Sequence, residues 1–177
     1  SILMIVLIAD HNKSTIASIE ELNPSFQVEL GDPLAFDIDA VVSPANTKGI
    51  MNGGYDAVLR RYFGLAIEYS VRQHLEKFQI DVGQAIAVKT GHTKVEWLIV
   101  SPTVSVTGEG LSGDASVSYA CAHNSVKVAI EKNVKYLGMT GLGTGVGGLD
   151  RREAARQQVQ GIEEALEKKT SMKKLLK

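Results

Sequence analysis

Cysteine is almost absent from this chain, because its 177 residues contain only Cys121. A lone cysteine forms no disulfide within the chain and no cysteine-based metal cluster, which favours a reducing, cytoplasmic compartment. We expect Cys121 to be a small buried hydrophobic residue. The alternative, a catalytic nucleophile, would require a partner base.

An excess of charge of either sign is also missing. The chain has 19 Lys and Arg against 20 Asp and Glu, a formal net charge of −1, so no overall field favours nucleic acid or an anionic membrane. The apolar N-terminal segment SILMIVLIAD ends at Asp10, far short of a membrane span, and lacks the marks of a signal peptide. The four histidines show no metal-binding spacing. We therefore expect no specific nucleic acid, no membrane partner, no metal and no cofactor.

The remaining composition suits one domain over residues 1–177, since 44% hydrophobic residues are enough for one well-buried core. Short apolar runs bounded by turn-forming residues predict strands over 2–9, 26–30, 39–43, 84–89, 96–100 and 136–140. Helical spacing predicts a helix capped by Ser14, helices over 55–63 and 65–78 broken at Gly64, a helix capped by Asp114, and a closing helix over 151–169. This alternation predicts an α/β fold whose mostly parallel sheet is covered by helices on both faces.

Glycine is abundant, and it is concentrated in two loops that each follow a predicted strand and precede a predicted helix. The first loop runs from Ser43 to Gly54, and the second is GLGTGVGGLD over 141–150. Backbone N–H groups and the positive end of the helix dipole meet at such loops, which suits a phosphate. Because ligands of α/β sheets bind outside the carboxyl ends of the strands, we expect both loops at one cleft. A tight loop with only a structural role is the alternative for the second one.

Residues 143–148 formally match the GxGxxG fingerprint of dinucleotide-binding proteins. That fingerprint belongs to a βαβ unit with an acidic residue after the next strand, whereas only a helix and a lysine-rich segment follow here. The chain also has no GxxxxGKS/T motif of a nucleoside triphosphatase. The second loop is therefore expected to wrap a diphosphate through backbone donors, without a lysine.

The two loop segments together resemble a known family. VVSPANTKGIMNGGYDAVLRRYFG over 41–64 and GLGTGVGGLDRREAARQ over 141–157 are similar to the two ligand-binding loops of macro domains, the second in the form found in bacterial and phage members. The resemblance implies a three-layer α/β/α fold with a mixed, mostly parallel sheet. It also implies that the ligand is ADP-ribose or an ADP-ribosylated substrate.

The resemblance assigns roles to individual residues. It places Asp32, beside Pro33, against the adenine amino group, and Asn46, after Ala45, against the distal ribose. Asp56, ten positions after Asn46, corresponds to a catalytic residue of the hydrolytic members. The residues implied to contact the diphosphate or the distal ribose are Gly53, Gly54, Tyr55, Gly141, Gly143, Thr144, Gly145, Val146 and Gly147.

Three functions are compatible with these residues. In an ADP-ribosyl hydrolase, Asp56 would orient or deprotonate a water that attacks the anomeric carbon of the distal ribose, while Asn46 positions the sugar. A non-catalytic ADP-ribose-binding module and an ADP-ribose 1″-phosphate phosphatase are the alternatives. For Asp56 itself, the alternative is a carboxylate that complements the dipole of the helix it begins.

The chain also departs from the family pattern. Ser43 and Pro44 replace the first Asn and the following Ala of the usual NAAN segment, which alters the polar support beneath the first loop. Gly147 stands where many relatives carry an aromatic that stacks on the distal ribose, and Tyr55 is a candidate replacement for that aromatic. Asp150 matches a subgroup that uses an Asp with a lysine, here Lys48, although a helix N-cap is the simpler interpretation.

Overall fold

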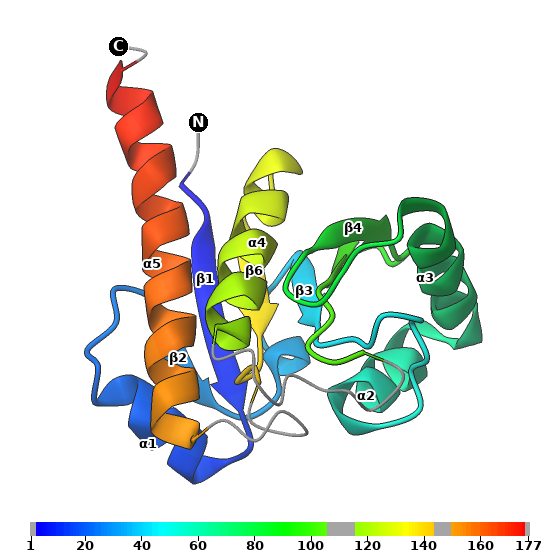
Figure 1. The fold of residues 1–177 in the computed structure, drawn as a ribbon, viewed down its shortest axis with the longest axis horizontal. Helices are drawn as coiled ribbons and strands as arrows, with labels where there is room; N and C mark the ends of the chain where they lie inside the picture. Colours follow the sequence, from blue (N-terminus) through cyan, green and yellow to red (C-terminus); the bar gives the residue numbers. More distant parts are fainter. Residues whose placement is uncertain (1–2, 106–115, 144–149, 176–177) are drawn as a thin grey trace.

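Six strands form one sheet in the order β2-β1-β6-β3-β5-β4 in the computed structural model, which describes residues 3–105, 116–143 and 150–175, without the side chains of 168–174 (Figure 1). All neighbouring strands pair in parallel except β4, which pairs antiparallel with β5 at one edge. The sheet is therefore mixed and mostly parallel, as predicted. The strands are β1 (Ile5–Asp10), β2 (Gln27–Leu30), β3 (Ala40–Ser43), β4 (Ile86–Lys89), β5 (Trp97–Val100) and β6 (Tyr136–Met139).

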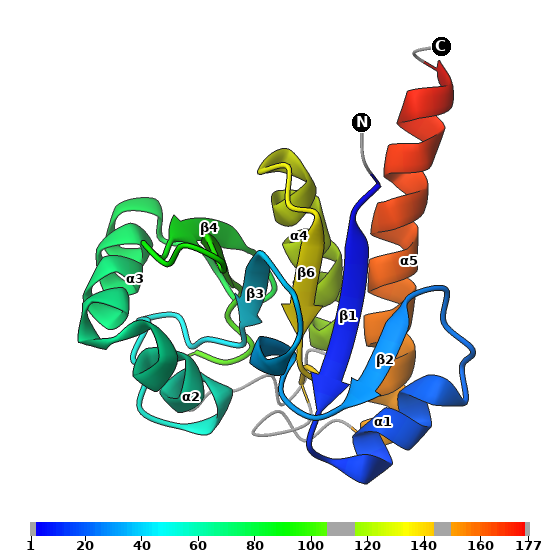
Figure 2. The same cartoon turned by 180° about the vertical axis from the view of Figure 1, so that it is seen from behind.

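Helices cover both faces of this sheet, as Figures 1 and 2 show from opposite sides. Alternate residues of a strand enter different cores: Val6 and Ile8 pack with residues of α1, α4 and α5, whereas Leu7 and Ala9 pack with residues of α2 and α3. This is the predicted three-layer α/β/α arrangement. The helices are α1 (Lys13–Glu20), α2 (Gly54–Phe63), α3 (Leu65–Phe78), α4 (Val117–Glu131) and α5 (Arg151–Leu175), with a 3₁₀ turn η1 (Pro33–Ala35).

The break between α2 and α3 occurs at Gly64, where it was predicted. Gly64 has φ +96°, a conformation that residues with a side chain rarely adopt. Its N–H still donates to the carbonyl of Arg60, 2.9 Å away, and so closes the last turn of α2. The glycine lets the chain redirect without leaving the end of the first helix unpaired.

Some helix boundaries differ from the predictions. α1 is capped by Asn12, whose Oδ1 accepts from the Thr15 N–H at 3.0 Å, and not by Ser14, which lies inside the helix. A second hydrogen bond holds Asn12 in this position, because the N–H of Asn12 donates to Asp10 Oδ1 at 2.8 Å. The predicted cap Asp114 lies outside the described residues, and Ser116 occupies the N-cap position of α4.

α5 extends to Leu175, beyond the predicted end at 169. Its last segment consists largely of lysine, leucine and methionine, which are strong helix formers and therefore continue the helix. None of the described helices is long and apolar enough to cross a membrane.

The parallel strands all direct their carboxyl ends to one edge of the sheet. In Figure 1 the arrowheads of β1, β3 and β6 point to the lower end of the molecule, opposite the C-terminal end of α5. The loops that follow these strands therefore gather at the lower edge, where the sequence predicted a cleft.

Candidate functional site

A cavity of about 560 Å³ lies at the carboxyl edge of the sheet. This volume is in the range of small-molecule sites. Its walls come from the end of β1, from the segments that follow β2, β3, β5 and β6, and from the first turn of α2. The residues that line these walls include Asp10, Asp32, Asn46, Tyr55, Asp56 and Gly141.

The cavity brings together every described residue that the sequence predicted for the site. These residues are Asp32, Pro33, Ala45, Asn46, Gly53, Gly54, Tyr55, Asp56, Gly141 and Gly143. The other four, Thr144, Gly145, Val146 and Gly147, lie outside the described residues. The described start of the second loop therefore lines the same cavity as the first loop, although about a hundred residues separate the two in the chain.

Sequence reasoning missed Asp10 and His11, which also line the cavity. Asp10 Oδ2 accepts the N–H of Gly141 at 3.0 Å, so the end of β1 fixes the first residue of the second loop. One signal was available: Asp10 directly follows the strand predicted over 2–9, and the carboxyl ends of parallel strands gather at the ligand site.

A buried glutamine of α5 holds the beginning of the second loop. Gln158 is 1% exposed; its Nε2 donates to the carbonyl of Thr140 at 2.8 Å, and its Oε1 accepts the N–H of Leu142 at 3.0 Å. The hydroxyl of Ser118 on α4 donates to the Leu142 carbonyl at 2.7 Å. The loop therefore begins from a backbone that two helices fix through hydrogen bonds.

Asn46 organises the first loop with its own side chain. Its Oδ1 accepts the N–H groups of Lys48 and Ile50, each at 3.1 Å, and its Nδ2 donates to the carbonyl of Ile50 at 2.8 Å. An amide nitrogen carries two hydrogens, and among the described residues only the Ile50 carbonyl accepts one of them, so Asn46 has a second donor for a ligand in the cavity. From α3, Glu68 accepts the N–H of Met51 at 2.6 Å and so anchors the end of the same loop.

Asp56 is a buried carboxyl in the wall of the cavity. It lies in the first turn of α2, is 5% exposed, and its Oδ1 accepts the hydroxyl of Ser43 at 2.5 Å. Burial raises the pKa of Asp56 to about 6; the hydrogen bond from Ser43 opposes this rise, and the nearby Glu68 carboxylate adds to it. A cavity carboxyl with a pKa near neutrality is a candidate general base.

Tyr55 joins two walls of the cavity. Its hydroxyl, at the start of α2, donates to Asp32 Oδ1 at 2.6 Å, and the same oxygen accepts the N–H of Leu34 at 2.9 Å. Burial and the adjacent Asp32 carboxylate raise the pKa of Tyr55, so its hydroxyl remains a donor. Tyr55 was the candidate to replace the aromatic that stacks on the distal ribose. In the structure its hydroxyl is instead bonded to Asp32, the residue predicted to recognise adenine.

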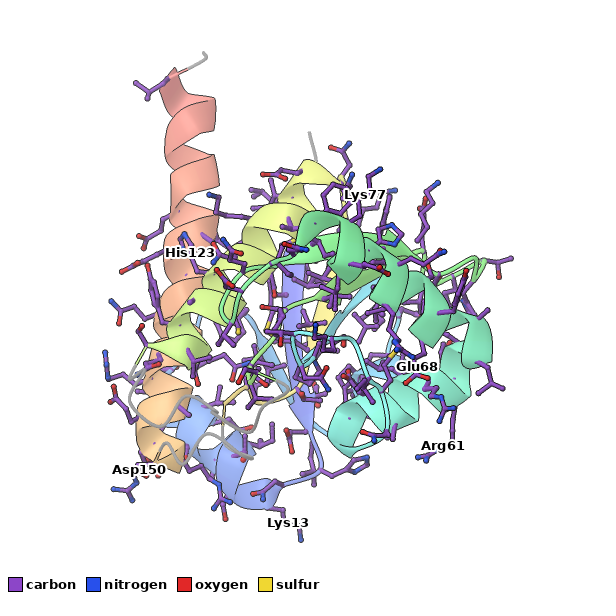
Figure 3. All side chains as sticks on the ribbon, turned by 45° about the vertical axis from the view of Figure 1, so that its right-hand side comes forward. Lys13, Arg61, Glu68, Lys77, His123 and Asp150 are labelled. Atoms are coloured by element: carbon purple, nitrogen blue, oxygen red, sulfur yellow. The ribbon has the colours of Figure 1, made fainter. Side chains whose placement is uncertain are left out.

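Asp150 acts as a helix cap. Its Oδ1 accepts the N–H of Arg152 at 3.2 Å, and its carbonyl accepts the N–H of Ala154 at 2.9 Å. Figure 3 shows Asp150 at the base of α5, well separated from α2 and Glu68. Asp150 is not among the described residues that line the cavity, and it forms no ion pair with Lys48, which is likewise described. In the described residues, Asp150 thus has the contacts of a helix N-cap, the simpler of its two interpretations.

Cys121 is fully buried on α4, as expected for a small hydrophobic residue, and its Sγ contacts the carbonyl of Pro102 at 3.3 Å. Within the described parts of the chain, no three His, Cys, Asp or Glu side chains are grouped so that they could hold a metal ion.

Comparisons with known proteins identify the family of this chain. The family model of the Macro domain matches residues 42–158. An uncharacterised protein of Aquifex aeolicus is 34% identical over 136 residues, which cover 77% of this chain and 79% of that protein. An uncharacterised protein of Aeropyrum pernix is 30% identical over 130 residues, which cover 73% of this chain and 66% of that protein.

Solved structures share the fold at lower identity. The macrodomain of Mycobacterium tuberculosis DarG superposes with a TM-score of 0.64 and 24% identity, over 76% of this chain and 87% of that one. A Trypanosoma brucei macrodomain in complex with ADP-ribose superposes with a TM-score of 0.64 and 19% identity, over 78% of this chain and 56% of that one.

Proposed function

This chain belongs to the macro domain family, and we propose that it binds ADP-ribose and hydrolyses an ADP-ribosyl derivative. The observation that carries the proposal is the single cavity in which Asp32, Asn46, Asp56 and the start of the second glycine loop meet. The family includes ADP-ribosyl hydrolases, and the Trypanosoma brucei structural relative was solved with ADP-ribose.

The cavity offers a matching group for each part of ADP-ribose. We place adenine against Asp32 and the distal ribose against Asn46 and Asp56, at the two ends of the same cavity. The diphosphate lies between Gly54 at the start of α2 and Gly143 of the second loop. The first N–H groups of α2 have no partner within the helix, and Gly53 at its N-cap position provides no side-chain cap, so these groups are available to an anion.

Hydrolysis follows from the position of Asp56. With a pKa of about 6, its carboxylate is ionised at neutral pH and accepts a proton from a water beside the distal ribose. The water oxygen forms a bond to the anomeric carbon, and the bond from that carbon to the acceptor group breaks. The acceptor leaves with the bonding electron pair and takes up, directly or through solvent, the proton that Asp56 received from the water, which regenerates the carboxylate. The Ser43 hydroxyl donates to Oδ1, and Oδ2, which accepts no hydrogen bond from the described residues, is the oxygen that takes the proton from the water.

Calorimetry with ADP-ribose, AMP and NAD tests the binding step. We expect ADP-ribose to bind most tightly, because it alone offers a free distal ribose together with the adenine and the diphosphate. Absence of ADP-ribose binding at near-millimolar concentration would contradict the proposal.

Product release from ADP-ribosylated protein and from ADP-ribose 1″-phosphate tests the chemistry. We expect Asp56→Asn to retain ADP-ribose binding and to lose at least about a hundredfold in hydrolysis, since general base catalysis contributes on that order. Asp150→Asn is the matched control and should leave the rate unchanged. Hydrolysis that survives Asp56→Asn would exclude Asp56 as the base.

Two other outcomes would identify the alternative functions. Binding without hydrolysis of either substrate in the wild-type protein would indicate a non-catalytic ADP-ribose-binding module. Cleavage of the 1″-phosphate alone would indicate a phosphatase that uses the same cavity.

A further inference from the structure

The hydrogen bond between Tyr55 and Asp32 connects two different elements that line the cavity. Tyr55 lies in the first turn of α2. Asp32 is the N-cap residue of the 3₁₀ turn η1, which follows the C-terminal end of β2. The Tyr55 ring is partly buried and packs on the core that contains α2 and α3. The bond of 2.6 Å is therefore made by a side chain with restricted freedom.

Both donors to Asp32 meet the same carboxylate oxygen. Oδ1 accepts the Tyr55 hydroxyl and the Leu34 N–H, while Oδ2 accepts no hydrogen bond from the described residues. Asp32 also lines the cavity. Two donors on one oxygen fix the rotation of the carboxylate, and this leaves Oδ2 as the oxygen that a ligand can use.

We propose that Tyr55 is a positioning residue that orients Asp32, so that Oδ2 accepts the exocyclic amino group of a 6-aminopurine and makes the site selective for that base. This inference rests on the proposed function, since it assumes that the purine lies at Asp32. It adds a residue that determines base selectivity, namely the tyrosine on α2.

The selectivity has a simple physical origin. A carboxylate in a partly enclosed cavity gains a charge-assisted hydrogen bond from an amino group, and a purine without that group leaves the carboxylate desolvated and unpaired. Without the tyrosine hydroxyl, one donor on Oδ1 is lost and the carboxylate can turn toward water. The amino group then gains less from its hydrogen bond to Asp32.

Calorimetry with two ligands tests this inference. The ligands are ADP-ribose and its analogue in which unsubstituted purine replaces adenine, and the proteins are wild type, Tyr55→Phe and Asp32→Ala. We expect the wild type to prefer ADP-ribose at least about tenfold, as for a hydrogen bond to a charged group. Tyr55→Phe should reduce the preference to about threefold or less with little change for the analogue, and Asp32→Ala should abolish it.

Tyr69→Phe is the matched control, because Tyr69 lies on α3, is 67% exposed and does not line the cavity. It should keep the wild-type preference. Thermal unfolding of each variant verifies that the fold is retained, which is expected since phenylalanine preserves the ring.

Three results would overturn the inference. Tyr55→Phe could weaken both ligands equally, which would indicate a packing role alone. It could leave the preference unchanged, or it could tighten ADP-ribose, which would mean that the hydroxyl competes with the base. Failure of the wild type to bind either ligand would instead contradict the proposed function, so the two failures are distinguishable.

Discussion

Ser43 replaces an asparagine of the family pattern, and in the structure it supports Asp56 directly. Both residues are buried, and the Ser43 hydroxyl donates to Asp56 at 2.5 Å although thirteen positions separate them in the chain. They meet because Ser43 ends β3 and Asp56 begins α2, at the two ends of the first loop. The serine therefore sets both the orientation and the proton affinity of the proposed base.

The pH dependence of hydrolysis follows from this pair. We expect the kcat/KM of the wild type to fall below about pH 6, because Asp56 must be ionised to accept a proton. The hydrogen bond from Ser43 lowers the pKa of Asp56, so Ser43→Ala should raise that pKa and move the acid limb of the profile to higher pH. Initial rates between about pH 4 and about pH 8, two units on each side of a pKa near 6, measure both effects.

Ser125→Ala is the control for this prediction. Ser125 is also fully buried, but it lies on α4, and its hydroxyl has no hydrogen-bond partner among the described residues. Its replacement should leave the acid limb in place. An unchanged acid limb in Ser43→Ala would show that Ser43 does not tune the proposed base.

At the scale of elements, α5 contributes to the site without lining it. Gln158 reaches from the helix into the core and pairs the backbone of Thr140 and Leu142 at the base of the second loop. Gln158→Met keeps a side chain of similar length and leaves two buried backbone groups unpaired. We expect a loss of about 2–4 kcal/mol in the free energy of unfolding and weaker ADP-ribose binding.

Urea unfolding and calorimetry measure these two losses. Gln160→Met is the control, since Gln160 lies on the same helix but is exposed, and it should change the unfolding free energy by no more than about 0.5 kcal/mol. A Gln158→Met protein as stable as the control would refute a supporting role for this glutamine.

The order and type of the elements could be predicted from sequence because each one carries its own hydrophobic period. β3, buried at all four positions, reads as a short apolar run, and α3 shows its buried face in Ile67, Val71 and Leu75. Boundaries were harder to predict. Asn12 and Ser14 are both capping residues, and a hydrogen bond from the Asn12 N–H to Asp10 decided between them.

The contacts that shape the site could not be read from local patterns. The loops were identified by their glycines and by the resemblance, but the Tyr55–Asp32 bond joins residues 23 positions apart, and the buried Gln158 is of a type that usually lies at the surface. Such contacts depend on which elements meet in three dimensions. Local sequence patterns predict the helices and strands themselves, but not which of them come into contact.

At the scale of the whole molecule, burial of Asp56 links the proposed chemistry to stability. Its pKa in the folded protein, about 6, is above the ordinary value of 3.8, so the folded state binds this proton more tightly than the unfolded state does. The contribution of Asp56 to stability is therefore most favourable below about pH 4, decreases as the pH rises through the interval to 6, and is lost above it.

Asp56→Asn should consequently be more stable than the wild type above pH 6, by up to about 3 kcal/mol, since a rise of about two pKa units corresponds to that free energy. The difference should vanish below about pH 4, where both side chains are neutral. Urea unfolding at pH 4 and pH 7.5 measures this difference in stability. The exposed Asp150→Asn is the control, and it is expected to stay within about 0.5 kcal/mol of the wild type at both pH values.

Equal stability of Asp56→Asn and wild type at pH 7.5 would mean that the ionised carboxylate is not destabilising in the folded state. A gain in stability together with lost hydrolysis would instead show that the fold retains a costly buried charge because the reaction uses it.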